Sequence, residues 1–143
     1  MPRATVFSMV LSVIALTAIG PLPCAAQASP REEGGFPFEL AEALVCEGVR
    51  EGIPFNQAIV FSASTGTLCC YTVFDDVRKD TFIYHQWLSR DKPSTRFKLS
   101  LKKPRWATFS SIQLREGDTG PWQVEIMDSG GEILKTLRFS VVD

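Results

Sequence analysis

The chain has 143 residues, with 15 Lys and Arg, 16 Asp and Glu and a single His, which give a formal net charge of −1 at pH 7. This near-balance argues against a nucleic-acid-binding protein that depends on an overall positive charge. The length is enough for one compact domain but not for two, so a single-domain protein is expected.

An export signal is predicted at the N-terminus. Arg3 precedes the apolar run Val6–Gly20, and Ala26-Gln27-Ala28 then fits the A-x-A rule for signal peptidase. The run is short for a membrane span. We therefore expect a signal peptide over residues 1–28, cleaved near Ala28, and a periplasmic or secreted mature chain without a transmembrane segment. Cleavage after Ala26 and a retained N-terminal anchor are the alternatives.

The segment after the signal, residues 29–43, begins polar and Gly-rich and is expected to be a flexible lead-in. Its last residues could form a short helix or run into a strand at Leu44. Beyond it, apolar or alternating stretches separated by turn residues predict about seven short strands, at 58–63, 66–76, 81–90, 94–102, 105–114, 122–128 and 133–142. This spacing is typical of a sandwich. We expect an all-β fold, an antiparallel immunoglobulin-like β-sandwich over residues 44–143.

The mature chain has three cysteines, Cys46, Cys69 and Cys70. An exported protein meets an oxidising compartment, so a disulfide is expected. A bond between adjacent cysteines is strained, so Cys46 is expected to pair with Cys69 or Cys70; we choose Cys46–Cys70 and leave Cys46–Cys69 open. Neighbouring strand residues face opposite sides, and this argues against a zinc site made of the three cysteines and the His.

Basic residues are concentrated between Arg90 and Arg105. Strict alternation in "STRFKLSLK" puts Arg96, Lys98 and Lys102 on one side of a strand, which we call the basic face. Such a face usually protects the edge of a sheet from pairing with another chain. The alternative is an anionic partner, such as a phospholipid or an acidic glycan.

The only histidine lies in the stretch "TFIYHQWLS". Alternation puts Ile83, His85 and Trp87 on one face of a strand that is partly apolar on both faces, so a central strand is expected. His85 then lies at the edge of the core, with a ring nitrogen hydrogen-bonded to an oxygen. A role in ligand binding or pH sensing is the alternative.

No catalytic motif is present. The sequence has no G-x-S-x-G, P-loop, H-E-x-x-H or G-x-G-x-x-G pattern, and any catalytic triad would need His85. Acidic pairs such as Asp75-Asp76 are typical of turns. We predict a protein that is not an enzyme and that uses no metal and no cofactor.

Several blocks of the sequence together resemble a known family, the domain of unknown function 2914 (DUF2914), a bacterial exported domain. The resemblance spans Val45 to Asp143 and rests on blocks that occur in the family's order: "VCEGVREGIP", "GTLCCYTVF", "IYHQW", "RWATFSS", "GPWQVEIMDSGGEIL" and "FSVV". It implies a β-sandwich and export. The family has no established activity that could be transferred to this chain.

The resemblance also assigns motifs to individual residues. The family's H-x-W motif falls on His85 and Trp87, and its W-R-[ST]-aromatic-S block falls on Trp106 to Ser110, with Ala107 where Arg is usual. A following Lys is replaced by Ile112. Its cysteine pattern falls on Cys46 and Cys70, which supports the chosen disulfide.

We therefore predict a non-catalytic exported domain that binds an envelope protein, a glycan or an anionic surface, and is a monomer or a dimer. Its recognition residues are expected to be His85, Trp87, Arg105, Trp106 and Ser110. Two alternatives come from other classes: an enzyme of carbohydrate or cell-wall metabolism that uses His85 as acid or base, and a structural domain that dimerises through Cys69.

Overall fold

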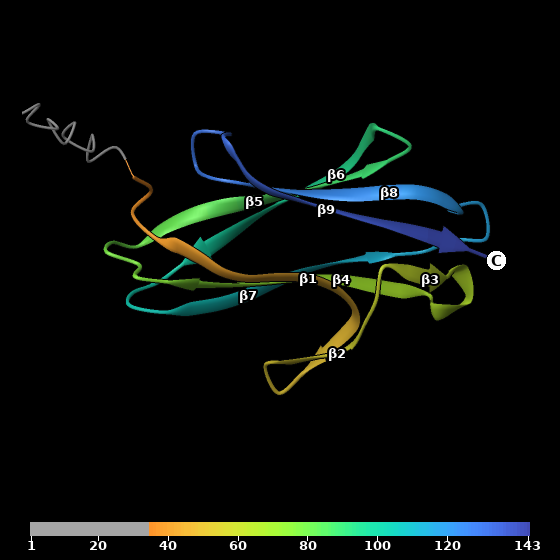
Figure 1. Cartoon of the computed structure of the whole chain (residues 1–143), viewed down its shortest axis with the longest axis horizontal. Coiled ribbons are helices and arrows are strands. Elements are labelled where there is room, and N and C mark those ends of the chain that lie inside the picture. Colours follow the sequence, from red (N-terminus) through yellow and green to blue (C-terminus); the bar gives the residue numbers. More distant parts are fainter. Residues whose placement is uncertain (1–34) are drawn as a thin grey trace, which may run out of the picture. The chain divides into compact units, whose positions relative to one another are not determined.

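The computed structural model describes residues 35–143; the predicted signal peptide and residues 29–34 lie outside this part of the chain. The described residues form an all-β sandwich of two sheets (Figure 1), so the expected fold class is confirmed. Its strands are β1 (Glu39–Arg50), β2 (Ile53–Gln57), β3 (Val60–Ser62), β4 (Thr67–Asp75), β5 (Thr81–Ser89), β6 (Lys92–Leu101), β7 (Trp106–Gln113), β8 (Gly120–Met127) and β9 (Ile133–Val142).

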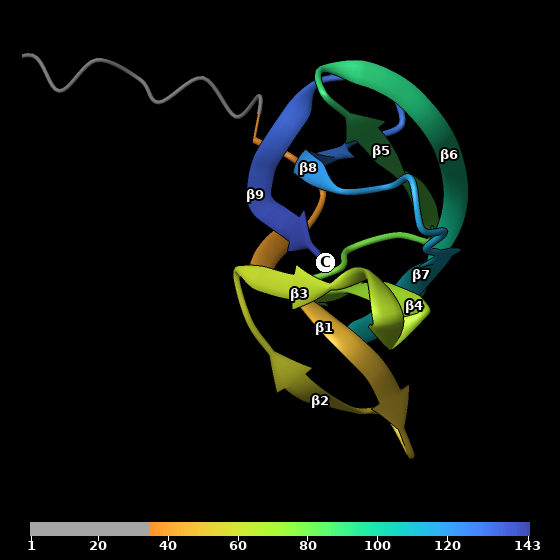
Figure 2. The same cartoon turned by 90° about the vertical axis from the view of Figure 1, so that its right-hand side faces the viewer.

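Sheet A has the strand order β2-β1-β4-β7, and sheet B has the order β3-β9-β8-β5-β6. All strand pairs are antiparallel except β3 with β9. Contacts join β6 and β7, the edge strands that lie on the same side of the sandwich (Figure 2). A 3-10 turn, η1 (Ala63–Thr65), follows β3. Within residues 35–143, no helix has the length and apolar character needed to cross a membrane.

The sandwich begins earlier than the expected boundary at residue 44, because β1 already starts at Glu39. The sequence pattern did not reveal this start, because a register shift between Leu40 and Glu42 interrupts the alternation of side chains along β1. Leu40 and Ala43 consequently both pack against the core, at a spacing that mimics one face of a helix. The expected lead-in thus contains the first five residues of a strand.

The core lies between the two sheets, and β4 shows how the alternating pattern builds it. Leu68, Cys70 and Phe74 belong to the main core cluster, whereas Cys69 and Tyr71 belong to a second cluster on the other side of sheet A. The alternation of side chains therefore divides β4 between the core and the outer face of sheet A.

The expected Cys46–Cys70 disulfide is wrong. Cys46, Cys69 and Cys70, the cysteines of residues 35–143, are free thiols, and no two of them are at bonding distance. Cys70 points into the sandwich, but Cys46 and Cys69 share the outer face of sheet A. A bond between Cys46 and Cys70 would have to pass through the sheet, which disulfide geometry does not allow. Spacing along the chain did not reveal which face of β1 carries Cys46.

The packing of sheet B gives a first testable prediction. Ile126 on β8 is fully buried, whereas Ile133 at the start of β9 is 50% exposed. Ile126→Ala should lower the free energy of unfolding by about 2–5 kcal/mol, because it leaves a cavity in the core. The matched change Ile133→Ala should cost less than about 1 kcal/mol. Chemical denaturation of both variants measures this, and equal losses would contradict the described core.

Candidate functional site

A chain of hydrogen bonds through His85 joins the two sheets inside the core. His85 and Trp87 come from β5 in sheet B, Thr72 from β4 and Ser110 from β7 in sheet A. His85 Nδ1 lies 2.8 Å from Ser110 Oγ and His85 Nε2 lies 3.2 Å from Thr72 Oγ1. Trp87 Nε1 donates to Ser110 Oγ at 3.0 Å, and Thr72 Oγ1 donates to the carbonyl oxygen of Thr108 at 3.3 Å.

The direction of each bond follows from the number of protons available. Thr72 gives its only hydroxyl proton to Thr108, so it must accept the proton on Nε2 of His85. Nδ1 is then the acceptor, and the hydroxyl of Ser110 donates to it while accepting from Trp87. All four side chains are satisfied by a neutral His85 that carries its proton on Nε2.

Burial keeps His85 in this neutral form. The side chain has no exposed surface, and desolvation lowers the pKa of its imidazole from 6.5 to about 4. Both ring nitrogens are already bonded, so neither is available to a substrate or a metal. The geometry is that of a structural histidine inside the core, and the expected central position of β5, between β8 and β6, is correct.

The five predicted recognition residues do not form one surface. His85 and Trp87 are fully buried and Ser110 is 4% exposed. Trp106 is half-buried and packs against the core, while Arg105 is exposed and forms an ion pair with Asp75 at 2.8 Å. The expected binding face is therefore wrong for the three residues of the network, because their side chains point into the core between the sheets.

Thr72 is the member of the network that sequence reasoning did not single out. A signal was present, since Thr72 shares its strand face with apolar residues such as Leu68 and Phe74. A hydroxyl on an apolar face needs a buried partner. The identity of that partner depends on how the two sheets are placed, which the sequence of one strand does not contain.

The basic face lies on β6, at the edge of sheet B, and just beyond it. Arg96 and Lys98 are exposed and lie over the rings of the paired strand β5. Lys98 Nζ is 4.0 Å from the ring centre of Phe82, and the guanidinium carbon of Arg96 is 5.0 Å from that of Tyr84. Lys102 follows the end of β6, with Nζ 5.7 Å from the ring centre of Trp106. Cation–π contacts of this kind hold the charges in place.

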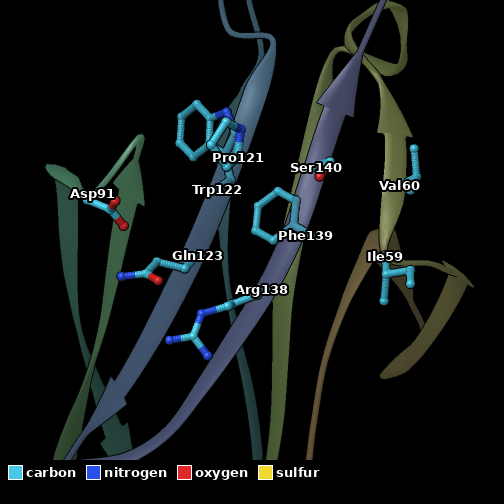
Figure 3. Close-up of a pocket in the computed structure, with 9 residues that line it drawn as sticks. All are labelled: Ile59, Val60, Asp91, Pro121, Trp122, Gln123, Arg138, Phe139 and Ser140. Atoms are coloured by element: carbon cyan, nitrogen blue, oxygen red, sulfur yellow. The ribbon is translucent and has the colours of Figure 1, made fainter.

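Three hollows on the described residues are large enough to receive a small ligand. The first, of about 380 Å³, crosses β8 and β9 from Asp91 to Ile59 and Val60 (Figure 3). The second, of about 390 Å³, lies beside β6 and β7 and includes Phe97, Gln113 and Trp122. The third, of about 420 Å³, is lined by Asp80, Thr81, Phe82, Lys98, Ser100, Leu101 and Lys102. None of the three is lined by the predicted recognition residues, but the third adjoins the basic face.

The lowered pKa of His85 predicts how stability depends on pH. The unfolded chain binds a proton at His85 near pH 6.5, whereas the folded chain resists it down to about pH 4. Protonation of His85 therefore does not affect the free energy of unfolding above about pH 6.5. As the pH falls from 6.5 toward 4, it lowers this free energy by roughly 3 kcal/mol.

His85→Gln, which has no titrating ring, should lack this component of the pH dependence. Unfolding in denaturant at several pH values for both proteins isolates it from the effect of the carboxylates. Parallel pH profiles for the two proteins would contradict the buried neutral histidine.

Comparison with known proteins finds a family match in the C-terminal part of the chain. Residues 80–141 match the family model described as "Protein of unknown function (DUF2914)". The match runs from β5 into β9 and includes His85, Trp87 and Ser110 of the network, while the blocks in β1, β2 and β4 lie outside it. No curated protein matches the chain. The match supports the resemblance of this part of the chain to the DUF2914 family.

Proposed function

We propose that this chain is an exported, non-catalytic binding domain whose basic face contacts an acidic glycan of the bacterial envelope. The observation that carries the proposal is that Lys98 and Lys102 border the same open hollow. The ion pairs formed among residues 35–143, Arg78–Asp76 and Arg105–Asp75, include neither lysine. Their positive charge is therefore left for a partner.

The surroundings of these lysines suit a sugar acid. Phe82 holds Lys98 by a cation–π contact, which reduces the side-chain entropy lost on binding. Thr81 and Ser100 add hydroxyl groups to the lining of the hollow. Asp80 also lines it, and its carboxylate accepts a hydrogen bond from the backbone N–H of Lys103 at 3.2 Å.

A glycan is favoured over a phospholipid surface because of where the exposed apolar side chains lie. Membrane-surface binding needs apolar residues that enter the lipid beside the basic ones. The large apolar side chains exposed in residues 35–143 lie on other strands or loops, at Ile53, Ile59, Val60, Phe109, Ile133 and Val142. None of them lies on β6 or on its paired strand β5.

The burial of His85 supports a binding function over a catalytic one. An acid or base must reach its substrate within hydrogen-bonding distance. His85 has no exposed surface and lines none of the three hollows, so the alternative of an enzyme that uses His85 receives no support from its position.

Removal of the charges of the basic face tests the proposal. The triple variant Arg96→Gln, Lys98→Gln and Lys102→Gln should bind an immobilised acidic polysaccharide, such as dextran sulfate, roughly tenfold to hundredfold more weakly than the unchanged chain. Binding of the unchanged chain should also weaken as salt is added. Surface plasmon resonance measures both effects, and vesicles that contain an anionic phospholipid serve as the competing ligand.

The matched control removes three exposed positive charges elsewhere, with Arg50→Gln, Arg115→Gln and Lys135→Gln. Its binding should stay within about twofold of the unchanged chain. An equal loss in both variants would refute a localised site. Unchanged binding together with self-association of the first variant would assign the basic face to protection of the β6 edge. Preferential binding to the vesicles would replace the glycan with a lipid surface.

A further inference from the structure

Two of the three thiols lie directly opposite each other on neighbouring strands. β1 and β4 run side by side in sheet A (Figure 1), and their register pairs Cys46 with Cys69. Both side chains belong to the same small apolar cluster on the outer face of the sheet, with Leu44, Tyr71 and Val73. Cys70 lies on the opposite face, in the core between the sheets.

This placement leaves one pair that can be joined without moving a strand. The Cα atoms of opposed residues in antiparallel strands lie about 4.5–5.5 Å apart. Disulfides accept Cα separations of about 4.4–6.8 Å. In the thiol form, Cys46 Sγ donates to the carbonyl oxygen of Gly48 at 3.3 Å. Rotation of the two side chains would give up this contact and bring the sulfur atoms together, whereas Cys70 would have to cross the sheet to reach either one.

We infer that Cys46 and Cys69 form a site of oxidative modification, at which a disulfide joins β1 to β4 while Cys70 remains a thiol. The oxidant required is a disulfide compound. The thiolate of one cysteine attacks the oxidant, forms a mixed disulfide and releases one thiol. The second cysteine then displaces the other thiol, so the pair loses two electrons and two protons and the oxidant becomes two thiols.

Burial decides when this reaction can happen. Cys46 has no exposed surface and Cys69 is 4% exposed. Burial raises the pKa of the Cys69 thiol to about 11, so the reactive thiolate is scarce in the folded protein at neutral pH. The bond is therefore expected to form while β1 and β4 are pairing, before the outer face is covered.

Disulfide mapping after refolding tests the inference. The full-length chain with Cys24→Ser is unfolded, refolded with oxidised glutathione, alkylated and digested for mass spectrometry. We expect one intramolecular disulfide between Cys46 and Cys69, with Cys70 alkylated only after unfolding. Because Cys69 and Cys70 share a peptide, fragmentation of the linked peptide identifies the bonded sulfur.

Two further variants provide an independent readout. Cys70→Ala should keep the disulfide, which non-reducing electrophoresis detects as faster migration, and Cys69→Ala should lose it. The bond should also raise the denaturant midpoint of the refolded protein above that of its reduced form. A Cys46–Cys70 bond, a disulfide-linked dimer, or three free thiols after oxidative refolding would each overturn the inference.

Discussion

The hydrogen bonds of His85 are the contacts on which the sandwich depends most directly, because they cross the core between its two sheets. A buried imidazole, two hydroxyls and an indole N–H would each destabilise an apolar core if left without a partner. Here each group satisfies another, from Trp87 through Ser110 and His85 to Thr72. The network thus fixes the position of β5 relative to β4 and β7. Apolar contacts alone are less directional and would specify this position less precisely.

Because the network residues are buried, the proposed functional groups lie on the outer faces of the two sheets. These two faces differ in chemistry. On sheet B, the basic face rests on the aromatic rings of β5 and adjoins a hollow. On sheet A, the outer face near β1 and β4 is apolar and carries the opposed pair Cys46 and Cys69. The proposed glycan contact and the proposed disulfide therefore lie on separate sheets, and each can be removed without touching the network.

Properties that depend on alternation along one strand could be predicted from the sequence. The inward direction of His85 and Trp87 and the outward direction of Lys98 follow from the twofold repeat of a strand. Properties that depend on pairing between strands could not. The register that sets Cys46 against Cys69 and the shift after Leu40 arise from tertiary contacts, and so does the meeting of His85 with Thr72 across the core. Of the predicted recognition residues, His85, Trp87 and Ser110 meet in the interior, whereas Arg105 is exposed.

The tautomer of His85 tests the central claim most directly. Nuclear magnetic resonance of the chain with nitrogen-15-labelled histidine distinguishes a protonated ring nitrogen from an unprotonated one. The account predicts a neutral ring with its proton on Nε2 and none on Nδ1, unchanged between about pH 8 and about pH 5.5. A proton on Nδ1, or a titration centred near the ordinary histidine pKa of about 6.5, would contradict it.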